Sequence, residues 1–137
     1  MGMIETDVLL ACINTRDRHH DEAVRLVESY AGQLALSPFS LLELDMLIRS
    51  GRVRIRDYGE FMTALSDFLA LYGVEVLTDK PIIHSLAEEL RARYSLTFFD
   101  SLHASAAVVY ELVLYSYDVV YEKVKTLRWK RPSDALG

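Results

Sequence analysis

Short runs of apolar residues alternate along the chain with longer segments in which apolar side chains recur every three or four positions. A short apolar run indicates a buried β-strand, whereas recurrence at i, i+3 and i+4 indicates an amphipathic α-helix. The predicted strands cover residues 3–6, 34–36, 74–77 and 112–116. Helical patterns cover residues 8–13, 20–31, 38–50, 57–71, 80–93, 98–111 and 119–124.

Several predicted helix ends carry typical capping residues. Ser37 followed by Pro38 predicts an N-cap and a proline in the first helical turn. Asp79 and Thr97 are the predicted N-caps of two later helices. Gly51 ends the helix that starts at Pro38, because glycine readily adopts the left-handed conformation that closes a helix. These residues separate the helices from the strands.

The alternation of strands with helices predicts an α/β fold. We expect a central parallel sheet of four or five strands with helices on both faces, as a three-layer α/β/α sandwich. A length of 137 residues suits one domain, and no linker or repeat divides residues 1–137. Residues 1–2 are a candidate cloning remnant ahead of a natural start at Met3, and residues 125–137 form a basic C-terminal tail. Ligands bind beyond the carboxyl ends of the strands in such sheets, so residues at those ends are candidate site residues.

Composition narrows the class of protein. Hydrophobic residues make up 51% of the chain and charged residues 26%, which suits a folded domain rather than a disordered one. No apolar run approaches the roughly 18–20 residues that span a bilayer, and Glu5 and Asp7 interrupt the N-terminal pattern of a signal peptide. We therefore expect a cytoplasmic protein. Cys12 is the only cysteine, which excludes an internal disulfide and a cysteine-based zinc site.

Acidic residues occupy the predicted strand ends. Glu5 and Asp7 lie at the end of the first strand, where an extended backbone would point both side chains to one face. Asp118 follows the fourth strand, and Glu43 and Asp100 lie among apolar residues on two helices. A charged carboxylate that is buried without a partner costs several kcal/mol, so converging carboxylates favour a bound cation. Oxygen ligands without cysteine favour Mg²⁺ or Mn²⁺ over zinc.

Each of these acids also has a structural explanation. Asp7 can cap the following helical turn, and Asp100 stands three residues after Thr97, which is the spacing of a capping box. Asp118 fits a turn, and Glu43 can extend from a helix edge into solvent. Taken singly, each acid is more often structural than catalytic. Their joint placement on successive strand–helix units is what indicates a site.

Four short motifs around these acids resemble those of one known family. They are Glu5-Thr6-Asp7-Val8-Leu9, Ser37-Pro38-Phe39-Ser40-Leu41-Leu42-Glu43, Asp100-Ser101-Leu102-His103-Ala104 and Ser116-Tyr117-Asp118-Val119-Val120-Tyr121. They resemble the motifs that carry the four acids of PIN domains, the fold of the toxin ribonucleases of VapBC-type toxin–antitoxin pairs. The resemblance covers nearly the whole chain. One position departs from it, since Glu5 stands at the family's first Asp and Asp7 stands where the family usually has Asn or Ser.

The resemblance implies a PIN-like fold and a Mg²⁺- or Mn²⁺-dependent endoribonuclease that acts as the toxin of such a pair. It implies catalytic and metal-binding roles for Glu5, Glu43, Asp100 and Asp118, with Asp7 as a fifth candidate ligand. The implied partners are RNA, an antitoxin protein and a second copy of the chain in a homodimer. Two alternatives stay open. One is a non-catalytic PIN-like module that only holds RNA or a protein, and the other is a metal-dependent phosphatase or a nuclease acting on DNA.

The net charge of −5 argues against a nucleic-acid partner, but the five candidate acids account for it, because 15 acids would otherwise face 15 basic residues. Two basic groups are candidates for contact with an RNA backbone. They are Arg49, Arg52, Arg54 and Arg56 in one group and residues 123–131 in the other. We expect contact from one of them, although solvated helix ends are the commoner explanation of such groups. His103 lies one helical turn after Asp100, as a packed helix residue or a hydrogen-bonding neighbour of the site.

Overall fold

A computed structural model describes all residues from Met1 to Gly137. The strands are β1 (Gly2–Ile4), β2 (Leu34–Leu36), β3 (Glu75–Val76), β4 (Val113–Tyr115) and β5 (Trp129–Lys130). The helices are α1 (Thr6–Ile13), α2 (His20–Ser29), α3 (Ser40–Arg49), α4 (Tyr58–Leu71), α5 (Pro81–Tyr94), α6 (Phe98–Val109), the 3₁₀-helix η1 (Val119–Lys123) and α7 (Pro132–Ala135). All five strands are parallel and form one sheet in the order β3-β2-β1-β4-β5.

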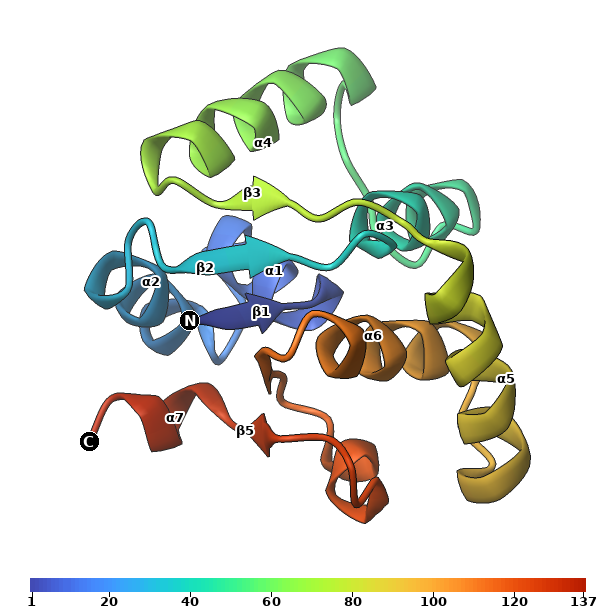
Figure 1. Cartoon of the computed structure of the whole chain (residues 1–137). Helices are drawn as coiled ribbons and strands as arrows, with labels where there is room; N and C mark the ends of the chain where they lie inside the picture. The colour runs from blue at the N-terminus through green and yellow to red at the C-terminus, as the bar shows by residue number, and fades with distance from the viewer.

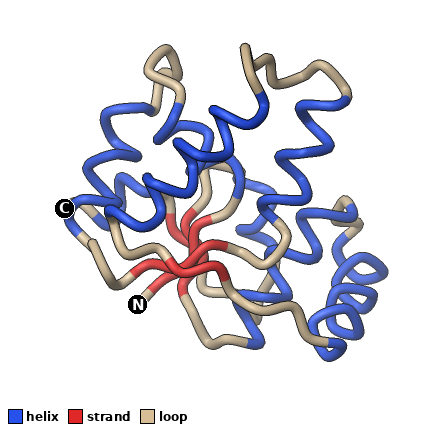
Figure 2. The backbone as a smooth tube through the Cα atoms, turned by 90° about the horizontal axis from the view of Figure 1, so that it is seen from above, coloured by secondary structure: helices blue, strands red, loops and turns tan.

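Helices cover both faces of this sheet (Figure 1, Figure 2). Successive residues of a strand point to opposite faces, and each face therefore has its own core. Met3 and Leu114 pack in one buried cluster with residues of α5 and α6. Ile4 and Tyr115 pack in the other with residues of α1, α2 and α4. The α/β fold with helices on both faces of a parallel sheet, predicted from the sequence, is confirmed.

The three central strands end at the same level of the sheet. Ile4 is paired with Leu36 of β2 on one side and with Tyr115 of β4 on the other. Because the strands are parallel, the next residue of each strand leaves the sheet at one common edge. Glu5, Ser37 and Ser116 are those residues, and all three are buried. The register of the sheet thus places one carboxylate and two hydroxyl groups side by side.

Two of the three predicted N-caps are absent from the structure. Ser37 is not an N-cap, because α3 begins at Ser40 with Phe39 as its N-cap. The Ser37 hydroxyl instead accepts the backbone N–H of Phe39 and lies 2.6 Å from Nδ1 of His103. The start of α5 also differs, since its N-cap is Lys80 and the Asp79 carboxylate pairs with His84. The other predicted cap is confirmed, because the Thr97 side chain accepts a hydrogen bond at the start of α6.

The segment predicted as a basic tail is folded. It contributes the edge strand β5, and the Trp129 indole N–H donates to the carbonyl of Ser116 at 3.0 Å. Helix α7 then packs against α2, where the Tyr30 hydroxyl donates to the carbonyl of Ala135 at 2.7 Å. The C-terminal segment therefore supports the edge of the sheet that carries Ser116.

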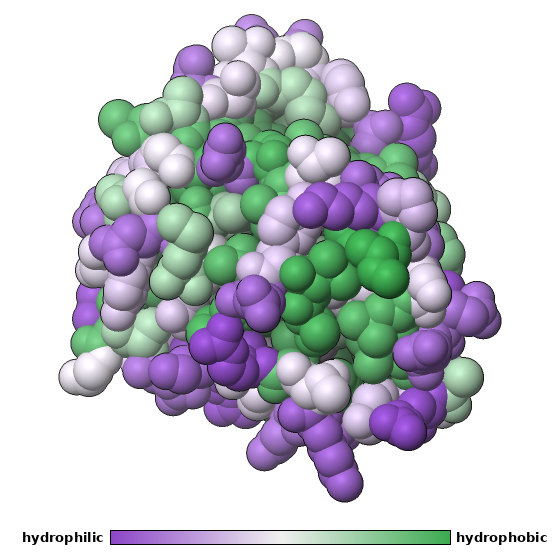
Figure 3. All heavy atoms as spheres, in the orientation of Figure 1, coloured by the Kyte–Doolittle hydropathy of each residue, from purple (hydrophilic) through white to green (hydrophobic).

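The surface of the domain leaves some large apolar side chains uncovered. Figure 3 shows apolar side chains gathered in the region of α5 and α6, and Ile82 and Phe98 of these helices are 59% and 58% exposed. None of the helices combines the length and the apolar character that crossing a membrane requires.

Candidate functional site

Glu5 starts the site at the end of β1. Its backbone is still extended, and its side chain caps α1 by accepting the N–H of Asp7 on Oε1 at 3.0 Å. The other oxygen, Oε2, accepts the hydroxyls of Ser116 at 3.1 Å and Tyr121 at 2.9 Å. The residue is only 5% exposed. Glu5 is therefore a buried carboxylate that hydrogen bonds from three segments of the chain hold in place.

Asp7 lies in the first turn of α1 rather than on an extended segment, so the predicted reason for its alignment with Glu5 is wrong. Its Oδ2 accepts the Ser116 hydroxyl and the N–H of Tyr117, both at 2.8 Å, and its Oδ1 accepts the N–H of Val8 at 2.6 Å. Burial and the neighbouring charge of Glu5 raise the pKa of Asp7 well above its ordinary value. These contacts tie α1 to the segment after β4 and give Asp7 a structural role.

Glu43 reaches the same edge from α3 and meets His103 of α6. The His103 ring is fully buried, and its Nε2 lies 2.8 Å from Oε1 of Glu43. Because Nδ1 lies against the Ser37 hydroxyl, both ring nitrogens are engaged. Burial alone would raise the pKa of Glu43, but the hydrogen bond and charge of His103 lower it below its ordinary value. The carboxylate of Glu43 is thus held in its ionised form.

Asp100 and Asp118 lie at the edge of the region that contains Glu5, Glu43 and His103. The N–H of Asp100 donates to Thr97, as a capping box requires, but its carboxylate meets the Tyr121 hydroxyl at 3.3 Å. Asp118 is exposed, and its carboxylate accepts the N–H of Val120 at 2.9 Å as the N-cap of η1. The turn role considered for Asp118 is therefore present in the structure.

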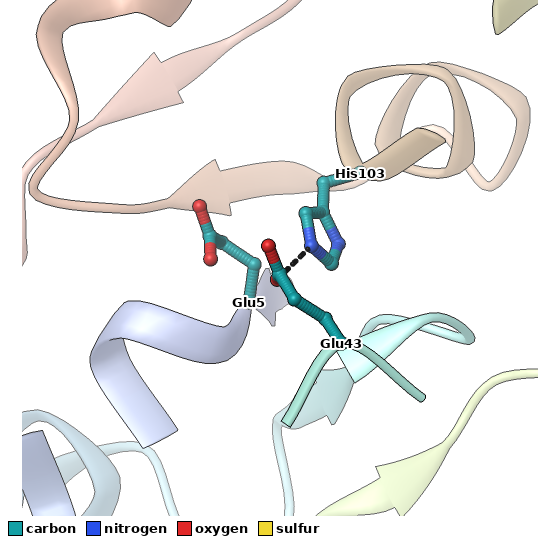
Figure 4. A group of neighbouring side chains, drawn as sticks. All are labelled: Glu5, Glu43 and His103. Carbon is teal, nitrogen blue, oxygen red and sulfur yellow. Dashed lines mark hydrogen bonds and ion pairs between the residues drawn. The ribbon is translucent and has the colours of Figure 1, made fainter. Parts of the chain in front are cut away.

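One group of side chains has the spacing of a metal site. The candidate ligand atoms of Glu5, Glu43 and His103 all lie within 4.8 Å of one another. Figure 4 shows that they come from the end of β1, from α3 and from α6, and that they meet at the carboxyl edge of the sheet. The structure does not bring Asp7, Asp100 or Asp118 into this group.

The donor atoms of this group fit a divalent cation. The two carboxylates supply the oxygen ligands that Mg²⁺ and Mn²⁺ prefer, whereas the His103 ring, with both nitrogens in hydrogen bonds, holds Glu43 in place. The buried Thr6 hydroxyl lies beside the same edge and adds to the lowering of the pKa of Glu43.

Two residues with direct contacts in the site had no predicted role in the site itself. The hydroxyl of Tyr121 joins Glu5 to Asp100, and Ser37 supports His103. For His103 a usable signal existed, because a residue three positions after Asp100 lies on the same face of a helix. No comparable signal connects Ser37 with a ring 66 residues away.

A cavity of about 290 Å³ adjoins Glu43 and is lined in part by Phe99 and Arg52. Arg52 also lines a neighbouring cavity of about 600 Å³, together with Arg54 and Arg56. None of these three guanidinium groups forms an ion pair in the structure. The predicted contact between a basic group and an RNA backbone stays a prediction, and this arginine segment lies beside the site.

The fold and the site together define an α/β domain with carboxylates gathered at the carboxyl edge of a parallel sheet. The model of the family described as PIN domain matches residues 3–127. The chain therefore belongs to the PIN domain family, as the motifs predicted. A comparison with curated protein sequences gives no match.

Solved structures of toxin–antitoxin proteins share this fold. VapBC2 from Rickettsia felis, bound to a DNA fragment from its promoter, has a TM-score of 0.75 at 20% identity, covering 94% of this chain and 96% of that one. DNA-bound VapBC from Salmonella typhimurium has a TM-score of 0.73 at 17% identity, covering 95% and 96%. A toxin–antitoxin complex from Klebsiella pneumoniae has a TM-score of 0.70 at 16% identity, covering 96% and 98%.

Proposed function

We propose that the protein is a Mg²⁺- or Mn²⁺-dependent endoribonuclease and the toxin of a VapBC-type toxin–antitoxin pair. The group formed by Glu5, Glu43 and His103 carries the proposal, because it places the buried carboxylate of Glu5 and the half-buried carboxylate of Glu43 within 4.8 Å of each other. Membership in the PIN domain family, whose members are generally nucleases, supports hydrolysis of a phosphodiester bond. The likeness to toxin–antitoxin structures supports an antitoxin as partner.

The proposed catalytic and metal-binding acids are Glu5, Glu43, Asp100 and Asp118, with Asp7 as an additional ligand. Glu5 is the better supported of the two N-terminal acids, because it belongs to the 4.8 Å group and Asp7 does not. A bound divalent cation would stabilise charge on the scissile phosphate and make a bound water more acidic. Since His103 holds Oε1 of Glu43, the second oxygen of that carboxylate is the one available to orient or deprotonate the attacking water.

Cleavage of a fluorescent single-stranded RNA tests the proposal. The wild-type protein should cleave it in Mg²⁺ or Mn²⁺ and not in EDTA. Asp100→Asn should abolish cleavage and leave the fold intact, because the amide keeps the size of the side chain and loses its charge. Asp67→Asn is the matched control, since Asp67 is an exposed residue of α4 outside the site. Full activity of Asp100→Asn would refute the assignment.

The same assay separates the alternative functions. A non-catalytic binding module has one observation in its favour, because protein donors already satisfy Glu5 and Asp7 without a cation. Binding of RNA without turnover at every metal concentration would support that module. Cleavage of DNA but not of RNA would support a deoxyribonuclease.

We also propose a homodimer and a cytoplasmic location. The exposed apolar side chains of α5 and α6 support self-association, because such patches often mark interfaces. Light scattering gives the mass of the protein in solution. Expression in cells, with and without the product of a short reading frame immediately upstream, tests the toxin role. Growth arrest that the upstream product relieves is the expected result.

A further inference from the structure

Tyr121 places a single hydroxyl group between two candidate metal ligands. Its hydroxyl oxygen lies 2.9 Å from Oε2 of Glu5 and 3.3 Å from Oδ1 of Asp100. Glu5 follows β1 and Asp100 lies on α6, so the two carboxylates come from segments that no other side-chain hydrogen bond joins directly. The hydroxyl is therefore the link between these two acids.

The position of this hydroxyl is fixed by the core. Tyr121 is 0% exposed, and its ring belongs to the buried cluster between the sheet and α5 and α6. A phenol is protonated at neutral pH, so the Tyr121 hydroxyl is a proton donor. A phenol has one hydrogen to donate, and two carboxylates converge on it. One of them is always left without its full hydrogen bond.

The length of the Glu5 side chain allows its carboxylate to reach the Tyr121 hydroxyl. An aspartate at this position would shorten the side chain by one carbon–carbon bond, about 1.5 Å. The carboxylate would then lie beyond hydrogen-bond distance of Tyr121, since the present separation is 2.9 Å. Glu5 and Tyr121 therefore depend on each other for their contact.

We propose that Tyr121 is a positioning residue of the metal centre, whose hydroxyl holds the carboxylates of Glu5 and Asp100 toward one cation. The inference rests on the metal-dependent activity proposed above. Tyr121 does not itself need to touch the cation or the RNA. Its effect is exerted through the two acids, as hydrogen-bond partners of metal ligands generally act.

Tyr121→Phe removes only the hydroxyl and leaves the ring in the core. We expect Mn²⁺ affinity, measured by calorimetry on the full chain without RNA, to fall by about 10- to 100-fold. Tyr115→Phe is the matched control, because Tyr115 is also buried and its hydroxyl contacts no carboxylate. Its Mn²⁺ affinity should equal that of the wild type. Circular dichroism checks that both variants are folded.

A double-mutant cycle separates positioning from a general loss of packing. Glu5→Asp should weaken Mn²⁺ binding, and adding Tyr121→Phe to it should cause a smaller further loss than in the wild-type background, because only the contact of the hydroxyl with Asp100 remains to be removed. Unchanged or tighter binding by Tyr121→Phe alone would overturn the inference, as would losses that add in the double variant. If the wild type cleaves RNA while Tyr121→Phe binds Mn²⁺ normally, only the inference fails. If the wild type binds no Mn²⁺, the metal dependence of the proposed function fails as well.

Discussion

Removal of the His103 imidazole should change how the stability of the metal-free protein depends on pH. Burial of this fully enclosed ring disfavours the imidazolium, but the carboxylates of Glu5, Glu43 and Asp100 outweigh burial and raise its pKa above 6.5. The folded protein therefore keeps a proton that the unfolded chain releases as the pH passes 6.5. The stabilisation from this proton is complete below pH 6.5 and is lost as the pH rises through the folded-state pKa.

The partner carboxylate acts in the opposite direction. The pKa of Glu43 is lowered from 4.5, so its contribution is present above pH 4.5 and is lost as the pH falls through the folded-state value. The ion pair of Glu43 with His103 therefore stabilises the fold most between these two transitions. A difference of one bound proton between the folded and unfolded states changes the free energy of unfolding by at most about 1.4 kcal/mol per pH unit. The expected loss begins near pH 6.5, stays below that limiting slope and ends above the folded-state pKa of His103.

Urea unfolding in EDTA at a series of pH values measures this slope. The wild type should lose stability above pH 6.5, and His103→Gln should lack that loss. Burial raises the pKa of Cys12 from 9.0 to about 12, so the series should stay below pH 9.0. The raised pKa of Asp7 acts in the same direction as that of His103, and only the difference between the variants reports the imidazole.

Two further variants keep the test decisive if His103→Gln fails to fold. Glu43→Gln keeps a polar group next to the ring and removes one charge that raises the pKa of His103, so the loss of stability above pH 6.5 should be smaller and should end at a lower pH than in the wild type. His84→Gln removes an imidazole that is about half exposed and pairs with Asp79 in solvent, and it should retain the wild-type slope. A wild-type protein whose stability stays flat above pH 6.5 would refute the reasoning, as would equal slopes in the wild type and Glu43→Gln.

Two other predictions concern the segment before α4. Replacing Arg52, Arg54 and Arg56 with Gln should flatten the salt dependence of RNA binding, because fewer counterions are released when the protein neutralises fewer phosphates. The measurement uses the Asp100→Asn background, so that the RNA is not cleaved. An unchanged slope would show that these arginines do not contact the RNA phosphates. Asp57→Ala should destabilise the fold by about 1 kcal/mol in urea, because the carboxylate caps α4 with a hydrogen bond of 2.8 Å. Asp67→Ala in the exposed middle of that helix is the control, and equal stability of the two variants would contradict the capping role.

The central strands were predictable because burial on both faces makes their sequences continuously apolar. Leu34–Leu36 is buried at every position, and the run appears directly in the sequence. The edge strand β5 lacks this signal, since Trp129 is half-buried and Lys130 is exposed. Its pairing with β4 depends on the neighbouring strand rather than on its own residues. A two-residue edge strand inside a basic segment therefore resembles a tail in the sequence.

The starts of the helices show a second reason why prediction from sequence fails. Ser37 has the composition of an N-cap, but its hydroxyl lies against His103, a residue distant in sequence. Thr97 has no such competitor and caps α6 as predicted. Capping preferences describe local competition for the first N–H groups of a helix. They fail where tertiary structure offers the same side chain another partner.

In the candidate site, the sequence predicted where the acids lie along the backbone but not which side chains they contact. The strand ends identified the acids, because parallel strands carry their next residues to one edge. The hydrogen bonds among those acids depend on the reach of each side chain, and sequence spacing does not provide it. Tyr121 illustrates this, because its ring was expected on a short helix and only the packing of the core directs its hydroxyl to Glu5 and Asp100.

The meeting of Glu5 and Asp7 depends on strand register rather than on their spacing. Capping by Glu5 starts α1 at Thr6, which rotates Asp7 away from the direction that an extended backbone would give it. Both carboxylates nevertheless accept the Ser116 hydroxyl, because the pairing of Ile4 with Tyr115 brings the ends of β1 and β4 to one level. A shift of β4 by one residue would move Ser116 away from both acids and turn its side chain to the other face. The pairing of β1 with β4 therefore holds the acidic edge together before any cation binds.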